Sequence, residues 1–289
     1  MRFWGRIFAA KAREQPAPVT TPAAVIPHRA YLHRPPTFTV GVATHPGLQR
    51  ERNEDSFAIF QSTVPRQGDH ISLGLFIVAD GMGGHEGGKV ASELAVREAA
   101  AIILNKFFVP TLGERGQAPV NEILGQAVMA ANAAVWSRVQ GKTMGTTLTA
   151  ALLLGRGIYI AHIGDSRAYL IGKAGMVQLT SDHSVVERLL SVGQLTKDEA
   201  RKHPQRSVLY RAVGQAEAIQ PDIYREELSK EERLLLCTDG LWEMLPDEEV
   251  ARLVNAFPDP QEACDELMVA ANSAGGEDNI TAILVRLDD

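Results

Sequence analysis

The alternation of hydrophobic and polar positions divides the chain from Thr37 onward into short strand-like and longer helix-like segments. Short runs of β-branched, aromatic and aliphatic residues, bounded by glycine-bearing turns, predict strands. These strands cover residues 38–44, 55–61, 71–80, 147–155, 158–164, 167–172, 176–180, 233–240 and 279–287. Apolar residues at helical spacing, such as Val120, Leu124 and Ala127, predict helices over residues 87–107, 119–139, 247–257 and 260–273.

The order of these segments indicates the architecture. Consecutive strands without intervening helices favour antiparallel hairpins, and the paired helices need a sheet face to cover. We therefore expect two packed sheets with helices outside. A polar, helix-prone stretch from residue 181 to about 214 interrupts the strands. Neither an internal repeat nor a second domain boundary is evident, so residues 37–289 are predicted to form a single catalytic domain.

Residues 1–36 differ from the rest in composition. They contain six Lys or Arg residues and one Glu, and their proline-rich part has no steady period. This predicts a basic, disordered N-terminal extension. Within residues 1–13, Phe3, Trp4, Ile7 and Phe8 would share one side of a helix, which favours peripheral contact with an anionic membrane. A disordered terminus with scattered aromatic residues is the alternative, and the sequence leaves both open.

Composition and charge narrow the class of protein. No apolar run reaches the roughly 18 residues that a membrane span requires, and no signal peptide is evident, so we expect a cytoplasmic protein. The chain has 29 basic and 35 acidic residues, and most of the basic excess lies in the extension. An acidic body argues against nucleic acid as a partner and suits cation binding. Cys237 and Cys264 form no metal-binding or redox pair, and we expect both to be buried.

Carboxylates recur at the ends of the predicted strands. Three strands end in an aspartate beside glycine or serine, at Asp80, Asp165 and Asp239, and acidic pairs precede two others, at Glu54 with Asp55 and at Glu277 with Asp278. Each one alone is typical of a turn. If the strands lie side by side, these carboxylates would come close together and repel one another strongly unless cations were bound. Because the ligands would be oxygen atoms, Mg²⁺ or Mn²⁺ is the favoured ion. Two such ions about 4 Å apart suit a displacement at phosphorus.

A phosphate also needs a positively charged clamp. Arg50 and Arg52 lie directly before the acidic pair at Glu54 and Asp55, so their guanidinium groups start close to the expected ions. A guanidinium can bind two phosphate oxygens at once. A solvated surface arginine is the alternative interpretation, and for Arg50 the sequence leaves both open.

Two other enzyme classes fit the sequence less well. Gly83, four further residues and Gly88-Lys89 resemble a nucleotide-binding P-loop, but Val90 stands where that motif needs Ser or Thr. The segment GDSRA at residues 164–168 resembles the nucleophile elbow of serine hydrolases. A strand pattern follows it where that elbow requires a helix. Both classes are therefore disfavoured.

Seven segments in order resemble the metal-dependent protein phosphatase family, the type 2C serine/threonine phosphatases, in their bacterial form. They are GLQRERNEDS, VADGMGGHEGGKVAS, MGTTLTA, IAHIGDSRAYL, LTSDHS, LLLCTDGLWEML and GGEDNITAILV, and they span about residues 38–287. The resemblance implies an α+β fold, a four-layer α-β-β-α sandwich of two mainly antiparallel sheets with paired helices outside. It also implies a binuclear Mn²⁺ or Mg²⁺ centre between the sheets.

The resemblance assigns metal-binding roles by position. The matching residues are Asp80, which bridges both ions; Gly81, which binds through its carbonyl; Asp239 and Asp278 on the other ion; Asp165 at a third, weaker site; and the water-mediated pair Glu54 and Asp55. Arg50 matches the phosphate-binding arginine. Met82 stands where animal members have a histidine proposed as general acid, and His85 is the catalytic candidate three residues further on. Tyr210 replaces a common threonine near the end of the family's mobile flap.

The function that follows is hydrolysis of phosphoserine and phosphothreonine in proteins by a metal-bound hydroxide, without a phospho-enzyme. The implied partners are phosphorylated proteins and an opposing Ser/Thr protein kinase, and a monomer is expected. The alternative is a catalytically silent phosphatase-like domain that binds phosphoproteins or senses a signal. Every direct metal-ligand position holds a suitable residue, which favours the enzyme.

Overall fold

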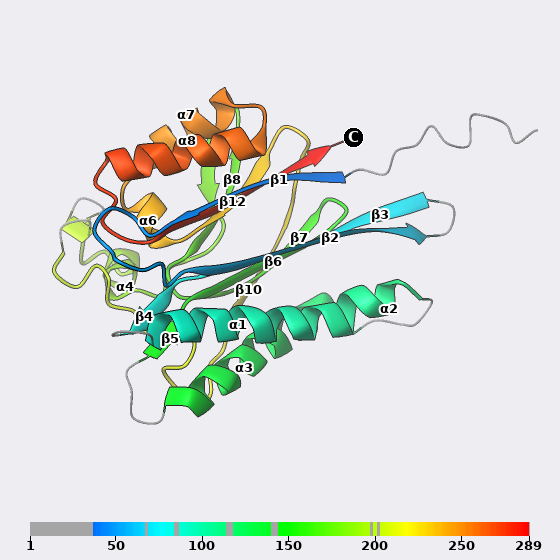
Figure 1. Ribbon diagram of the computed structural model, residues 1–289, viewed down its shortest axis with the longest axis horizontal. Coiled ribbons are helices and arrows are strands. Elements are labelled where there is room, and N and C mark those ends of the chain that lie inside the picture. The colour runs from blue at the N-terminus through cyan, green and yellow to red at the C-terminus, as the bar shows by residue number, and fades with distance from the viewer. Residues whose placement is uncertain are drawn as a thin grey trace, which may run out of the picture. The chain divides into compact units, whose positions relative to one another are not determined.

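The computed structural model describes residues 37–66, 69–83, 87–113, 118–139, 144–196, 199–200 and 203–288. Within these ranges, two five-stranded antiparallel sheets form the centre of the molecule (Figure 1). The first sheet has the order β1 (Thr37–His45), β12 (Ile280–Asp288), β11 (Arg233–Cys237), β8 (Arg167–Gly172) and β9 (Gly175–Gln178). The second has the order β10 (Asp222–Glu227), β7 (Gly157–Ile163), β6 (Leu148–Leu154), β3 (Asp69–Ala79) and β2 (Ser56–Arg66).

Helices cover the outer face of each sheet. Helices α7 (Asp247–Ala256) and α8 (Pro260–Ser273) lie over the first sheet, and α1 (Gly87–Ile103) and α3 (Val120–Val139) lie over the second (Figure 1). A π-helical turn (Leu104–Phe108) and the short α2 (Val109–Thr111) extend α1. The predicted four-layer α-β-β-α sandwich is confirmed. None of the helices in the described ranges combines the length and hydropathy needed to cross a bilayer.

Side chains along each strand point alternately to the two faces of the sheet, and this alternation explains why three separate hydrophobic cores form. In β3, Leu75 and Ile77 pack with the residues of α1 and α3, whereas Phe76 and Val78 pack with the residues between the sheets. Successive side chains of a strand point to opposite faces, so a strand that is apolar throughout must be covered on both sides. The third core lies between the first sheet and α7 and α8.

Local signals set where the last helix begins. The side chain of Asp259 accepts hydrogen bonds from the backbone N–H groups of Gln261 and Glu262, and Pro260 occupies the first helical turn. An aspartate at the N-cap satisfies donors that have no partner within the helix, and proline suits the first turn because it needs no donor there. Helix α8 therefore starts where the sequence predicted it.

Several short or exposed elements were missing from the sequence prediction. The strands β4 (Gly81–Gly83) and β5 (Met144–Thr146) form a two-stranded ribbon that is too short to show a period. The edge strand β10 is half exposed and rich in charged residues, so its pattern does not stand out. The helix α6 (Asp239–Trp242) is a single turn. Residues 1–36 lie outside the described ranges, and the predictions for them stay predictions.

Candidate active site

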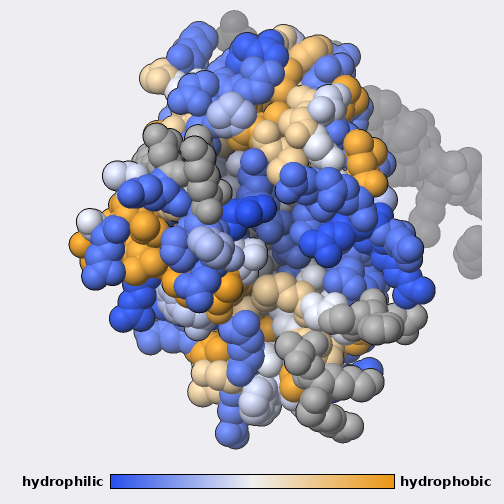
Figure 2. Space-filling model, turned by 90° about the vertical axis from the view of Figure 1, so that its left-hand side faces the viewer, coloured by the Kyte–Doolittle hydropathy of each residue, from blue (hydrophilic) through white to orange (hydrophobic). Residues whose placement is uncertain are grey.

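One end of the sandwich contains a cavity of about 1640 Å³ that is lined by acidic and basic side chains. Figure 2 shows hydrophilic residues gathered around the hollow at this end. The cavity lining includes the predicted site residues Arg50, Glu54, Asp80, Gly81, Asp165, Asp239 and Asp278. Asp80 and Asp165 follow strands of one sheet, and Asp239 and Asp278 lie at strands of the other. The site therefore lies where the ends of the two sheets meet.

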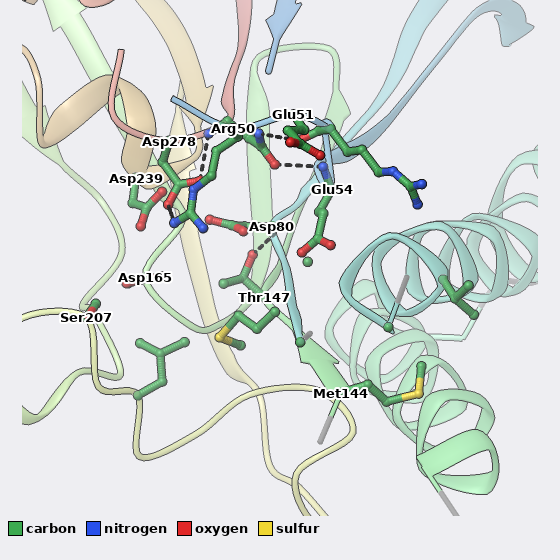
Figure 3. Close-up of a pocket in the computed structure, with 18 of the residues that line it drawn as sticks. Arg50, Glu51, Glu54, Asp80, Met144, Thr147, Asp165, Ser207, Asp239 and Asp278 are labelled. Carbon is green, nitrogen blue, oxygen red and sulfur yellow. Dashed lines mark hydrogen bonds and ion pairs between the residues drawn. The ribbon is translucent and has the colours of Figure 1, made fainter. Parts of the chain in front are cut away.

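Asp80 is held by its own backbone between β3 and β4. Its N–H donates to Thr147 Oγ1 at 2.8 Å, and its carbonyl accepts from the N–H of Thr147 at 2.9 Å (Figure 3). Gly81 is packed so closely that an added Cβ would lie 2.3 Å from the carbonyl oxygen of Gly88 and 2.6 Å from that of Glu54. This backbone approach requires glycine, and it fixes the direction in which Asp80 enters the cavity.

Asp239 and Asp278 are brought together by the pairing of β11 with β12. Cys237 opposes Ala282 in this antiparallel pair, so the residues that follow β11 lie beside those that precede β12. Asp239 then begins α6, and Asp278 lies two positions before the first residue of β12. Neighbouring strand ends therefore place carboxylates that are far apart in sequence at one point (Figure 3).

The electrostatics of the cluster favour a cation. Burial raises the pKa of Asp80 well above its usual range, and the charges of Asp239, Asp55 and Asp165 raise it further. Burial likewise raises the pKa of Asp239, with repulsion from Asp165 and Asp278. Asp239 Oδ1 is buried and has no hydrogen-bond partner among the described residues. Crowded carboxylates with an unsatisfied buried oxygen are a donor set that suits a hard divalent ion.

Arg50 lies against this cluster. Its Nη2 is 2.6 Å from Asp278 Oδ2, while its side chain remains 57% exposed, so the guanidinium is accessible from the cavity. The hydrogen bond to Asp278 raises the pKa of Arg50.

Within the described ranges, no three His, Cys, Asp or Glu side chains already converge as ligands of one ion. A bound ion would compete with Arg50 for Asp278 Oδ2.

The adjacent residues Glu54 and Asp55 point to different places. Glu54 lines the cavity, and burial raises its pKa. Asp55 is not among the cavity-lining residues, and its Oδ2 accepts hydrogen bonds from Thr238 Oγ1 at 2.8 Å and Thr281 Oγ1 at 2.7 Å. Its Oδ1 is buried and accepts no hydrogen bond from the residues that the structure describes. The Asp55 carboxylate thus joins β11 and β12 just behind Asp239 and Asp278.

Asp165 occupies the turn after β7 and is 6% exposed. Burial raises its pKa to about 7, with Asp182 adding to the shift and Arg167 opposing it. The indole Nε1 of Trp242 donates to the Asp165 carbonyl at 3.1 Å, and the Arg167 guanidinium stacks 3.5 Å from the centre of that indole. Asp165 is therefore held firmly at the edge of the cluster.

Some site features were not predicted, and one prediction lies outside the described residues. His85 belongs to the undescribed residues 84–86. Asn279 was missed: its Oδ1 accepts from the N–H of Glu54 at 2.7 Å, and its Nδ2 donates to the carbonyls of Pro46 and Arg52 at 2.9 Å. It thereby fixes the loop that carries Arg50. Its place directly after Asp278, inside the segment GGEDN, was the only available signal.

Comparisons with known proteins agree with this geometry. The family model described as Protein phosphatase 2C matches residues 49–284. The Listeria innocua protein named serine/threonine phosphatase stp is 36% identical over 249 residues, which cover 84% of this chain and 93% of that protein. The crystal structure of the Mycobacterium tuberculosis serine/threonine phosphatase PstP/Ppp has a TM-score of 0.73 at 33% identity and covers 87% of this chain and 99% of that one.

A further solved structure contains metal. It is the catalytic domain of the serine/threonine protein phosphatase PstP in complex with two manganese ions, with a TM-score of 0.71 and 30% identity over 87% of this chain and 99% of that one. The fold and the carboxylate-lined site define a protein of the metal-dependent phosphatase class. This chain belongs to the protein phosphatase 2C family.

Proposed function

We propose that this chain hydrolyses phosphoserine and phosphothreonine in proteins at the carboxylate-lined cavity, using two Mn²⁺ or Mg²⁺ ions. The observation that carries the proposal is the convergence of Asp80, Asp239 and Asp278, at strand ends of both sheets, beside the exposed guanidinium of Arg50. The relatives named as serine/threonine phosphatases and the two manganese ions in PstP support it.

The chain offers a complete set of oxygen ligands. Asp80 would bind both ions, Gly81 would supply its carbonyl to one of them, and Asp239 and Asp278 would bind the other. Asp165 would hold a third, weaker ion at the edge of the cluster, and Glu54 would act through water. When bound, the ions supply an activated water and compensate charge at phosphorus.

Arg50 would orient the phosphate group. A guanidinium can bind two phosphate oxygens, and its ion pair with Asp278 holds it beside the cluster until a phosphate replaces that contact. Asp55 acts in this proposal mainly by holding Thr238 and Thr281, and therefore the strand ends that carry the ligands. The role of His85 as an acid catalyst stays a prediction.

The deciding experiment measures hydrolysis of a phosphothreonine peptide and of p-nitrophenyl phosphate. Wild-type protein with Mn²⁺ should turn over both substrates, and addition of a chelator should abolish turnover. The Asp239→Asn variant should be inactive with Mn²⁺ present. Turnover that survives chelation and this substitution would contradict the mechanism. An absence of turnover in every condition would favour the silent, phosphoprotein-binding alternative.

The finer partner assignments belong to the same proposal. We further propose that a Ser/Thr protein kinase opposes this activity and that the enzyme is monomeric and cytoplasmic. Peripheral membrane contact through residues 1–13 is tested by co-sedimentation with anionic liposomes, comparing the full chain with a version that starts at Thr37. Equal partitioning of the two would contradict membrane contact.

A further inference from the structure

A buried histidine holds the backbone of the Asp165 turn. His183 is 1% exposed, and its Nδ1 accepts a hydrogen bond from the N–H of Gly164 at 3.0 Å. The N–H of His183 also donates to the Gly164 carbonyl at 2.7 Å. Gly164 has a φ of 109°, and an added Cβ would lie 2.5 Å from Thr147 Cγ2. His183 thus binds both the backbone N–H and the backbone carbonyl of Gly164, the residue before Asp165. This turn has no space for a side chain at Gly164.

The other nitrogen of His183 meets a carboxylate from the edge strand β10. Because Nδ1 accepts, the proton of the neutral ring is on Nε2, which lies 3.2 Å from Asp222 Oδ2. The second oxygen of Asp222 accepts from Arg211 Nη1 at 2.7 Å, and Arg211 also donates to the Gln220 carbonyl at 3.0 Å. One carboxylate is therefore shared by His183 and Arg211.

Arg211 follows closely on residues that form the cavity wall. Ser207 and Leu209 both line the cavity. The segment that contains them runs beside the residues after His183: Leu209 pairs with Ser184, and the N–H of Tyr210 donates to the His183 carbonyl at 2.9 Å. The carboxylate of Asp222 thus connects this wall to the turn that positions Asp165.

We propose that Asp222 is a positioning residue that couples Asp165 to the Ser207–Leu209 wall through its hydrogen bonds to His183 and Arg211. The inference rests on the proposed function, since it takes Asp165 as the ligand of the weakest ion and the wall as a contact for the substrate peptide. Binding of the ion and fit of the peptide then depend on one shared carboxylate, and loss of that carboxylate disturbs both.

The test compares three substitutions that remove different parts of this connection. His183→Gln removes the imidazole contacts to Gly164 and Asp222 and keeps the backbone bond to the Gly164 carbonyl. Arg211→Gln removes the guanidinium contact to Asp222, and Asp222→Ala removes the carboxylate that both side chains share. The exposed Glu226 on the same strand provides the control, as Glu226→Ala. Isothermal titration with Mn²⁺ measures affinity at the weakest site, and steady-state kinetics on a phosphothreonine peptide measure KM and kcat.

Loss of a hydrogen bond to a charged group should change each affected quantity by about fivefold or more. We expect His183→Gln to weaken the third Mn²⁺ and Arg211→Gln to raise the peptide KM. Asp222→Ala should do both, with a larger change in KM than in kcat, and Asp222→Asn should recover part of the loss because its amide oxygen still accepts from Arg211. Glu226→Ala should change neither.

Two results would overturn the inference. One is an Asp222→Ala protein with wild-type circular dichroism whose third Mn²⁺ affinity and peptide KM both stay within twofold of wild type. The other is an equal loss of both quantities in all three variants, which would indicate general destabilisation. If Asp222→Ala does not fold, Asp222→Asn is judged against the same two criteria. If the proposed function is wrong, the wild-type protein will show no Mn²⁺-dependent turnover. The Mn²⁺ titrations do not depend on turnover, so they still test whether the hydrogen bond from Gly164 to His183 affects Mn²⁺ affinity.

Discussion

Thr281 Oγ1 lies 2.7 Å from Asp55 Oδ2, which joins the start of β2 to β12 across 226 residues of sequence. The same oxygen accepts from Thr238, and the N–H of Thr281 donates to Thr238 Oγ1 at 2.9 Å. Thr238 directly precedes Asp239, and Thr281 lies three residues after Asp278. These hydrogen bonds therefore hold together the two backbone segments that carry the proposed metal ligands.

Replacing Thr281 by valine should destabilise the protein by about 1.5–3 kcal/mol, because a buried carboxylate loses one of its donors. Urea unfolding in the presence of a chelator measures this free energy. Thr281→Ser keeps the hydroxyl and is the matched control, with a smaller expected loss. A valine variant that is as stable as the serine variant would show that the hydrogen bond contributes little.

The Asp239→Asn substitution should have opposite effects on stability and on metal binding. Burial and neighbouring carboxylates raise the pKa of Asp239, so its ionised form opposes folding when no metal is bound. We expect the variant to unfold at a higher temperature than wild type in chelator at pH 8. We also expect Mn²⁺ to stabilise wild type and to stabilise the variant much less. Differential scanning calorimetry with and without Mn²⁺ measures both, and equal stabilisation of the two proteins by Mn²⁺ would contradict the assignment.

Stability without metal should fall as the pH rises from 6.5 to 8. The pKa of Asp165 is raised from an ordinary value of 3.8 to about 7 by burial, so the folded state binds this proton more tightly than the unfolded state. The resulting stabilisation is complete below about pH 4 and is lost as the pH rises through 7. Burial lowers the pKa of His162 from 6.5 to about 3, so His162 opposes stability only below pH 6.5.

The measurement is the melting temperature in chelator across this range, for wild type and Asp165→Asn. The asparagine variant should show a weaker dependence on pH, because it lacks the titrating proton. Asp265→Asn, at an exposed position on α8, is the control and should follow wild type. Parallel curves for wild type and Asp165→Asn would assign the pH dependence to other groups.

Substitution of Arg50 should impair phosphate binding more than metal binding. Removal of a charged, two-pronged contact in Arg50→Ala should lower kcat/KM for a phosphothreonine peptide by about 10- to 100-fold. The kcat/KM of Arg50→Lys should lie between the values for Arg50→Ala and wild type, because lysine keeps the positive charge but cannot bind two phosphate oxygens at once. Mn²⁺ affinity by titration calorimetry should not fall, since Asp278 loses a competing partner. Arg156→Ala, in the exposed turn between β6 and β7, is the control, and an effect of the same size there would contradict a specific role for Arg50.

The sequence was sufficient for most of the elements because each carries its own local signal. The apolar run that contains Leu75 to Val78 has to be a strand buried on both faces, and Asp259-Pro260 marks the start of α8. The position of a carboxylate at a strand end is equally local, and it identified Asp80, Asp239 and Asp278. The short ribbon of β4 and β5 and the half-exposed β10 lacked such signals, since neither has a long apolar face.

Only the tertiary structure decided which of these carboxylates meet. Asp80 follows a strand of one sheet and Asp239 a strand of the other, and their approach depends on how the two sheets pack, which no local pattern encodes. Glu54 and Asp55 are neighbours in sequence, yet one lines the cavity while the other binds Thr238 and Thr281 behind it. Successive side chains of an extended backbone point in opposite directions, so only the completed packing determines which of the two faces the cavity.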